Sequence, residues 1–461
     1  MLKSLKKPVI FLLLLTIILF AIFAFSLSSK TSLLDENSTL LKYEVTAVFA
    51  GSIKHKIQIS NLATKAITGG RLFIPLLRNE TSRHLVLVSN ISSAWVPDFL
   101  VDDFGNLYAV WGNLRIYGGQ SFTVEISYNV TSFGVRYQIN PNLVEDYNKS
   151  SSLYWNYTQP ETLIESSSQE INSTAQNIVG NENDTHEKVY KIYNFVVEHL
   201  KYKAQEEEMG ALWALRNGVG DCSEYSYLFV ALCRAAGIPA RVQAGFAFHY
   251  ENSVVEDGHM WAEYYIENYG WVPVDATWRL FNALDYLHFG SLRSMSTVIP
   301  YSNFFFNYTS GPEEEFVSEK QWFSISSLPK TSLDNSFVED AADIVAKIVK
   351  AKNVVFLGKI LGASTIFPSE VNEAERSLKE SMILLQNAIE SLEESLQMAL
   401  LNATEAAQNA DKALHIGWVI IIKLLSIFLS ILTLIMTVVV VFFMKHDRVR
   451  WKARKGEQHK Q

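Results

Sequence analysis

The pattern of hydrophobic and polar positions divides the chain into segments, and two long hydrophobic runs lie near its ends. Residues 8–29 and 424–444 contain 22 and 21 consecutive uncharged residues. A helix of about 20 residues crosses the roughly 30 Å hydrocarbon core of a membrane. We therefore expect a transmembrane helix or signal anchor within residues 1–30 and a transmembrane helix over residues 417–444.

Basic residues flank both runs on their terminal sides. They are Lys3, Lys6 and Lys7 before the first run and seven Lys or Arg residues in the tail 445–461. The positive-inside rule places both termini in the cytoplasm, so residues 31–416 are expected to be extracellular on a cell-membrane protein. A cleaved signal peptide is the alternative for the first run, because Ala24 and Ser26 fit positions −3 and −1 of a cleavage site. Both interpretations export the middle of the chain.

Composition supports export and excludes one class of partner. Ten Asn-X-Ser/Thr sequons occur where chance gives about four, which is typical of a glycosylated surface. An Asn- and Ser-rich surface without glycans is the alternative. Residues 30–416 hold 29 basic and 46 acidic residues, so we expect no nucleic-acid partner. The sequons lie at Asn37, Asn79, Asn90, Asn129, Asn148, Asn156, Asn172, Asn183, Asn307 and Asn402.

Residues 31–160 have the pattern of an antiparallel β-sandwich. Short apolar or alternating segments are separated by glycine and asparagine, with no helical segment between them. The expected strands are 43–49, 53–59, 72–76, 84–88, 107–111 and 121–130. No chemical motif lies among them, so we expect a packing or ligand-presenting domain.

The hydrophobic period changes to that of a mixed α+β domain over residues 161–333. One helical face lies within residues 189–200, and a further helix begins near Leu212. A third helix is predicted over residues 222–236, because Gly237 is suited to end it. Strands are expected at 240–248, 259–266 and 271–275. Helices followed by strands indicate the α+β class.

Residues 334–416 are expected to form a helical stalk. A first helix ends near Ala351, and a long helix runs from about Val371 to Leu414. The long helix carries apolar residues alternately four and three apart, which is the heptad pattern of a coiled coil or helical hairpin. We expect this seam either to pack on helix 337–351 or to mediate self-association. The seam residues are Leu378, Met382, Leu385, Ile389, Leu392, Leu396, Ala399, Ala403, Ala406, Ala410 and Ala413.

The chain has two cysteines, and their surroundings differ. Cys222 and Cys233 lie 11 residues apart on one predicted helix, about 16 Å, whereas a disulfide needs Cα atoms within about 7 Å. Cys233 falls three turns into an apolar helix and is expected to be buried. Cys222 follows Gly220 and Asp221 at the helix start, where free N–H groups and the helix dipole stabilise a thiolate. Cys222 is therefore the candidate nucleophile.

A thiolate nucleophile needs a base and a group that orients the base. His259 begins one predicted strand and Asp275 ends the next. Their side chains share a face only if paired residues have an even sum of numbers, which requires a loop of odd length. A Cys-His-Asp triad therefore requires a loop of odd length in this hairpin. The other histidines considered, His249, His288 and His415, are expected to be surface or packing residues.

Residues 218–278 resemble the transglutaminase-like superfamily. The resemblance rests on four segments, GDCSEYS from Gly220, LCRAAGIPAR from Leu232, GHMWAE from Gly258 and GWVPVDATW from Gly270. It implies a papain-like fold over residues 161–333, with catalytic roles for Cys222 as nucleophile, His259 as base and Asp275 as orienting residue.

Two further positions near the motif are Met260 and Trp213. Met260 departs mildly from the family pattern, since alanine is common after that histidine. No oxyanion-hole side chain is assured: Trp213 lies upstream of the nucleophile, with its spacing as the one argument for it.

These features lead to one function hypothesis and two alternatives. The hypothesis is a membrane-anchored exterior cysteine enzyme of acyl transfer that acts on a protein or peptide substrate as a protease, deamidase or transglutaminase. A non-enzymatic surface protein that binds or assembles through its papain-like domain is the first alternative. Hydrolysis of one peptide bond of a cell wall is the second. We expect no metal and no cofactor, because His-Glu-x-x-His, paired Cys-x-x-Cys, phosphate-loop and dinucleotide-binding patterns are missing from the sequence.

Overall fold

The computed structural model describes residues 40–80, 83–293, 303–327, 336–392 and 394–458, with the backbone alone for 446–458. The hydrophobic run at 8–29 lies outside the described residues. The chain divides into two compact units. One comprises residues 40–345 with 385–401, and the other comprises residues 346–384 with the described residues from 402 onward.

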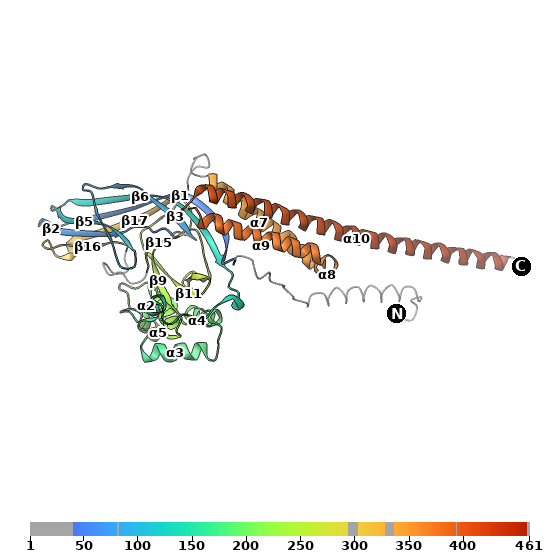
Figure 1. Cartoon of the computed structure of the whole chain (residues 1–461), viewed down its shortest axis with the longest axis horizontal. Helices are drawn as coiled ribbons and strands as arrows, with labels where there is room; N and C mark the ends of the chain where they lie inside the picture. Colours follow the sequence, from blue (N-terminus) through green and yellow to red (C-terminus); the bar gives the residue numbers. More distant parts are fainter. Residues whose placement is uncertain (1–39, 81–82, 294–302, 328–335, 393, 459–461) are drawn as a thin grey trace. The chain divides into compact units, whose positions relative to one another are not determined.

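Two antiparallel sheets begin the first unit. The strands before residue 140 are β1 (Tyr43–Asn61), β2 (Ile67–Pro75), β3 (His84–Ser92), β4 (Asp98–Val101), β5 (Leu107–Ile116) and β6 (Ser121–Tyr137). β1, β3 and β6 belong to one sheet and β2, β4 and β5 to the other (Figure 1). The two sheets share one apolar core, which includes Ile57 of β1, Ile74 of β2 and Trp111 of β5.

Four further strands of these sheets come from beyond residue 160. They are β10 (Val254–Val255), β14 (Ala283–Leu284), β16 (Phe305–Asn307) and β17 (Val317–Ser327). The strand orders are β10-β17-β1-β6-β14, with β3 also paired to β6, and β16-β2-β5-β4. β17 pairs along β1 from Gly51 opposite Ser327 to Asn61 opposite Val317. The sandwich is therefore completed by a strand that follows the motif region in the chain.

The prediction of separate strands at 43–49 and 53–59 was wrong, because both belong to β1. Gly51, which suggested a break, pairs with Val130 on one side and Ser327 on the other. A Cβ atom on Gly51 would lie 2.4 Å from the carbonyl oxygen of Ser326. Glycine at this position therefore permits close strand packing in the middle of a sheet and does not mark a turn.

The motif region forms helices packed on a third antiparallel sheet. The helices are α2 (Ser152–Thr158), α3 (Gln169–Val179), α4 (Thr185–His199), α5 (Ala211–Asn217) and α6 (Cys222–Ala235). The sheet has the order β13-β12-β11-β9-β15, formed by β9 (Ala240–Ala247), β11 (His259–Ile266), β12 (Gly270–Asp275), β13 (Leu280–Phe281) and β15 (His288–Arg293). The same unit also contains a parallel pair, β7 (Lys201–Tyr202) and β8 (Val219–Gly220), and two 3-10 turns, Pro141–Leu143 and Glu314–Phe316. α6 contacts α3, α4 and α5 as well as β9 and β11, so the central helix begins with Cys222.

The C-terminal part is helical. Its elements are α7 (Ser336–Ile360), α8 (Ala363–Ile366), α9 (Pro368–Glu390) and α10 (Leu396–Gln458). Figure 1 shows α7, α9 and α10 side by side. The Ser381 hydroxyl donates to the carbonyl of Ala406 at 2.7 Å, and Lys347 pairs with Asp411 at 3.0 Å. α10 thus packs on both α9 and α7, which is the helical-hairpin alternative of the sequence prediction.

The prediction of one helix from 371 to 414 was wrong, because the chain turns between α9 and α10. The Ser391 hydroxyl donates back to the carbonyl of Asn387 at 2.7 Å, and the Ser395 hydroxyl accepts from the N–H of Met398 at 3.3 Å. These serines close one helix and cap the next. Leu396 of the predicted seam is consequently exposed, whereas the alanines from Ala399 onward are buried.

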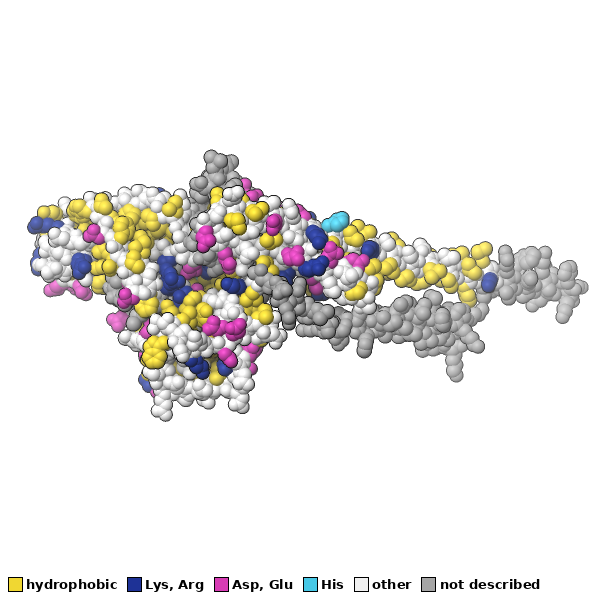
Figure 2. All heavy atoms as spheres, viewed as in Figure 1, with side chains coloured by type: hydrophobic (Ala, Val, Ile, Leu, Met, Phe, Trp, Pro, Cys, Tyr) yellow, Lys and Arg dark blue, Asp and Glu magenta, His cyan; other side chains and the backbone are white. Residues whose placement is uncertain are grey.

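α10 continues without interruption from the hairpin into the second hydrophobic run. Among the described residues, one helix is long and apolar enough to cross a membrane, over Leu396–Lys445. Hydrophobic side chains follow this helix in Figure 2, and most of those from Leu425 to Met444 are exposed. The length and composition of α10 therefore suit the predicted transmembrane segment.

Candidate active site

Cys222 stands at the first position of α6, held there by a capping box. The Asp221 carboxylate accepts from the N–H of Ser223 at 3.0 Å, and Glu224 accepts from the N–H of Asp221 at 3.1 Å. A Cβ atom on Gly220 would lie 2.3 Å from Cβ of Glu224, so glycine lets the Glu224 side chain fold back on the helix start. The segment Gly-Asp-Cys-Ser-Glu therefore fixes the backbone on which the thiol is carried.

The same two carboxylates fasten the loop before α5 to the helix start. Asp221 accepts from the N–H of Gln205 at 3.1 Å, and the buried Glu224 accepts from the N–H of Met209 at 2.9 Å. Glu208 in this loop accepts from the Tyr227 hydroxyl of α6 at 2.7 Å. Cys222 itself is partly exposed, whereas Cys233 is fully buried, as expected.

The hairpin of β11 and β12 has the register that the triad demands. Ala262 pairs with Val274 and Ile266 pairs with Gly270, so the paired numbers have an even sum and the loop has three residues. Asn268 and Gly270 adopt φ values of 70° and 83°, the left-handed region that suits asparagine and glycine. His259 and Asp275 therefore share one face of the sheet.

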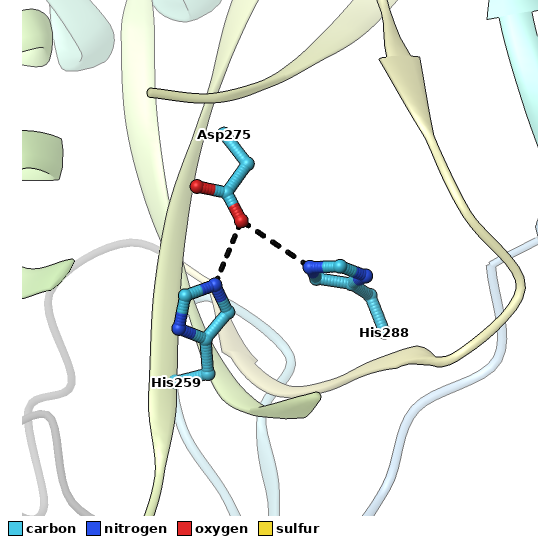
Figure 3. Close-up of side chains that lie close together, drawn as sticks. All are labelled: His259, Asp275 and His288. Carbon is cyan, nitrogen blue, oxygen red and sulfur yellow. Dashed lines mark hydrogen bonds and ion pairs between the residues drawn. The ribbon is translucent and has the colours of Figure 1, made fainter. Parts of the chain in front are cut away.

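Asp275 receives three hydrogen bonds within a buried pocket. His259 Nε2 lies 2.7 Å and His288 Nε2 lies 3.2 Å from the same oxygen, Oδ2, as Figure 3 shows. The N–H of Trp278 donates to Oδ1 at 2.9 Å. Burial raises the pKa of the Asp275 carboxyl, but the hydrogen bonds and charges of His259 and then His288 outweigh burial, so the pKa lies below its usual range.

His259 lies between the carboxylate and the thiol. Burial lowers its pKa, but the hydrogen bond and charge of Asp275, followed by those of Cys222, outweigh burial and raise the pKa of His259 to about 9. Because Nε2 of His259 faces Asp275, Nδ1 is the ring nitrogen left for the hydrogen bond with Cys222. The structure thus brings together Cys222, His259 and Asp275.

His288 also belongs to this cluster, and the sequence did not indicate that. It is fully buried on β15, and its Nδ1 lies 2.8 Å from Oδ1 of Asp285. The sequence predicted a surface or packing residue, and no motif marks His288, because its position depends on the order of strands in the sheet. His249 and His415 are exposed, as expected.

Three ligand atoms of this cluster, from His259, Asp275 and His288, lie within 4.8 Å of one another, which is close enough for a metal ion. Both imidazoles, however, direct Nε2 to the same carboxylate oxygen at hydrogen-bond distance. This donor set fits a carboxylate shared by two N–H groups. Trp213 lies half-buried on α5, and in the described part of the chain no hydrogen bond or ring contact joins it to the three predicted residues.

Comparison with known proteins finds matches to the part of the chain that contains Cys222, His259 and Asp275. The model of the transglutaminase-like superfamily matches residues 172–276. A protein-glutamine gamma-glutamyltransferase from Pseudomonas aeruginosa is 38% identical over 68 residues, which are 13% of this chain and 10% of that enzyme. The chain therefore matches about a tenth of the length of this curated relative.

The solved structures that match the chain include two bacterial proteins. A proposed cysteine protease from Cytophaga hutchinsonii is 18% identical, with 62% of this chain and all of that chain covered, at a TM-score of 0.44. The periplasmic domain of TgpA from Pseudomonas aeruginosa is 17% identical, with 50% of this chain and 90% of that chain covered, at a TM-score of 0.28. The family match and the curated relative thus support the transglutaminase-like superfamily for residues 172–276, the part of the chain that carries Cys222, His259 and Asp275.

Proposed function

We propose that this protein is a cysteine-dependent acyl-transfer enzyme acting on amide or peptide bonds. One observation carries the proposal: the imidazole of His259 lies between the thiol of Cys222 and the carboxylate of Asp275, with Nε2 2.7 Å from Oδ2. A nucleophile, a base and an orienting group in this order are the parts of a catalytic triad.

The proposed reaction begins with attack of the Cys222 thiolate on a substrate carbonyl carbon. The tetrahedral intermediate collapses as the carbon–nitrogen bond breaks, and the His259 imidazolium gives its Nδ1 proton to the leaving amine or ammonia. A thioester remains on Cys222. Water or a second amine then loses a proton to His259 and attacks the thioester, which releases the acyl product and regenerates the thiolate.

The negative charge on the tetrahedral oxygen needs hydrogen-bond donors. The backbone N–H of Cys222 is in the first turn of α6, where N–H groups have no partner within the helix. We assign this N–H as one oxyanion donor, since it lies on the residue whose sulfur carries the intermediate.

The substrate is proposed to be a protein or peptide outside the cytoplasm. The name of the Pseudomonas aeruginosa relative indicates glutamine side chains as the first substrates to test. A membrane span by α10, a papain-like arrangement around α6 and exterior residues 31–416 complete the proposal, with both termini in the cytoplasm. The exposure of the apolar side chains between Leu425 and Met444 supports this placement.

Alkylation of the full chain in detergent with iodoacetamide, followed by peptide mass spectrometry, tests the nucleophile. We expect modification at Cys222 and none at the buried Cys233, and Cys222→Ala should abolish labelling. Wild type and Cys222→Ala are then compared with glutamine-containing peptides and a primary amine, by measurement of released ammonia and incorporated amine. Reactive Cys222 without turnover on any peptide or amine would contradict the enzyme proposal and favour a binding role.

A further inference from the structure

His288 has a carboxylate at each of its two ring nitrogens. Its Nε2 lies 3.2 Å from Oδ2 of Asp275, and its Nδ1 lies 2.8 Å from Oδ1 of Asp285. The imidazole is fully buried, with ring contacts to Trp261 and Trp278 at 5.4 and 4.6 Å. Both ring nitrogens therefore face a carboxylate oxygen directly, at hydrogen-bond distance.

The number of protons at this site follows from hydrogen-bond chemistry. An ionised carboxylate only accepts, and a neutral imidazole carries a single N–H. Two ionised carboxylates can therefore both be satisfied only by an imidazolium. Burial lowers the pKa of His288, but the bonds to Asp275 and Asp285 outweigh it, so the pKa is raised. The pKa of Asp285 is lowered, since the His288 bond outweighs burial there too.

We propose that His288 is a positioning residue: a buried imidazolium, held by Asp285, that fixes the carboxylate of Asp275 and takes up part of its charge. Oδ2 of Asp275 is then shared between two N–H donors, while Trp278 holds Oδ1. The inference deepens the proposed function and rests on it, because it concerns the effect of the Asp275 carboxylate on the basicity of His259.

The other charged groups around His288 leave this assignment intact. Arg83 donates from Nη2 to the carbonyl oxygen of His288 at 2.7 Å and pairs with Glu80 at 3.3 Å. Among the described residues, His259 is a further titratable neighbour; its ring centre lies 5.4 Å away, and it also contacts Cys222. A positive charge at His288 therefore opposes a second positive charge on His259.

The pH dependence of Cys222 alkylation by iodoacetamide tests this inference without any substrate. The thiolate–imidazolium pair changes reactivity at two pH values, and the upper one reports loss of the His259 proton. Asp285→Asn removes the carboxylate that keeps His288 charged, at a side chain that is 37% exposed and suited to substitution. We expect its upper inflection to move to higher pH by roughly 0.6 to 2 units, the range given by Coulomb's law at 5.4 Å.

Two further variants complete the experiment. His288→Gln keeps one donor toward Asp275 but carries no charge, so we expect the same upward shift. Glu251→Gln is the matched control, because Glu251 accepts from the neighbouring Tyr286 and does not contact His288. We expect no shift in that variant.

The outcomes separate this inference from the proposed function. An unchanged upper inflection in Asp285→Asn, with slower alkylation at every pH, would overturn the charged role and leave a structural one. An upward shift in both variants supports the inference even if no peptide or amine is turned over. Failure of turnover alone contradicts only the enzyme proposal.

A second inference concerns the corner where α7 leads into α8, and it rests on different residues. Five apolar side chains of this corner are 41% to 63% exposed. The other side of the corner packs on α10. A Cβ atom on Gly358 would lie 3.2 Å from Ile420. Ala363 and Val371 form one core with Ile420 and Leu424. The five are Phe356, Leu357, Ile360, Leu361 and Ile366, which we name the apolar corner.

The apolar corner lies at the level where α10 enters its hydrophobic run, since that run begins at Leu424. Two ion pairs neutralise the charges beside it, Lys359 with Glu375 at 2.6 Å and Lys423 with Glu370 at 2.9 Å. We infer that the apolar corner enters the interfacial layer of the membrane that α10 is proposed to span. Continuity with the apolar surface of α10 is the reason to assign lipid as its partner.

Photo-crosslinking in phosphatidylcholine vesicles tests this second inference on the full chain. Benzoylphenylalanine replaces either Phe356 or Val349, which is also exposed on α7 but lies about 10 Å farther from the corner. We expect lipid adducts from position 356 and none from position 349. Lipid adducts from neither position, or from both, would overturn the inference, as would a crosslink from 356 to a second copy.

Discussion

Gly220 and Glu224 lie so close that a methyl group on the glycine would meet Cβ of the glutamate at 2.3 Å. The side chain of Glu224 folds over this glycine to close the capping box of α6. The position of the Cys222 thiol therefore depends on the absence of a side chain two residues earlier.

We expect Gly220→Ala to displace Glu224 and open the start of α6. The free energy of unfolding should fall by about 1 to 3 kcal/mol, and alkylation of Cys222 should slow. Urea denaturation and the alkylation rate measure both effects. Gly112→Ala is the control, since a Cβ atom there meets no atom within 4 Å. Equal behaviour of the two variants would contradict the role assigned to Gly220.

The rate of acyl transfer should fall as the pH rises above about 9. Asp275 and Cys222 raise the pKa of His259 to about 9, so the imidazolium that protonates the leaving amine persists below that pH and is lost above it. The pH profile of kcat/KM measures this directly. A basic limb near pH 6.5, the ordinary value for histidine, would contradict the contacts described for His259.

Asp275→Asn should lower the rate roughly 10³-fold or more while the fold remains. Two imidazole N–H groups point at Oδ2 and the Trp278 N–H points at Oδ1. An amide has one accepting oxygen, so no orientation of asparagine satisfies all three donors. Steady-state kinetics and circular dichroism test this expectation. Asp257→Asn, which removes an exposed carboxylate, should leave the rate within about twofold.

Much of this site follows from local sequence, and part of it does not. Asp221 and Gly237 bracket α6 within a few residues, so the helix was predicted to within one residue. The triad requires an even register of β11 and β12, and the loop of three residues supplies it. His288 reaches Asp275 through the packing of separate strands, and neighbouring residues hold no sign of that contact. For the same reason the pairing of Gly51 with Ser327 could not be predicted.

Ala406→Leu should destabilise the helical hairpin. Ala406 is fully buried and its carbonyl accepts from Ser381 of α9, so a larger side chain would push the helices apart. We expect a loss of about 1 to 3 kcal/mol in the free energy of unfolding. Chemical denaturation followed by circular dichroism measures it. Gln408→Leu adds the same side chain at an exposed position of α10 and should change stability by less than about 0.5 kcal/mol.

The sequons should differ in glycan occupancy. Asn129 is exposed on β6, whereas the Asn172 amide donates to the carbonyls of Ser166 and Ser168 at 3.0 and 3.1 Å. A glycan on Asn172 would replace one of the two amide hydrogens that make these bonds, so we expect a glycan at Asn129 and none at Asn172. Glycopeptide mass spectrometry of the protein from its native cells measures the occupancy of both asparagines. A glycan at Asn172 would contradict the expectation.

The pairing of β17 with β1 has a consequence for the order in which the chain is made. β1 is synthesised early, yet its partner along Gly51 to Asn61 ends only at Ser327. Until that residue has left the ribosome and any export channel, one edge of β1 stays unpaired and open to wrong strands. The motif region has been synthesised before then, so it can fold first. The sandwich, whose strands precede and follow the motif region in the chain, still lacks its last strand at that point. Truncation between β15 and β17 would therefore leave the sandwich without its closing strand, while the sheet of the motif region keeps all of its strands.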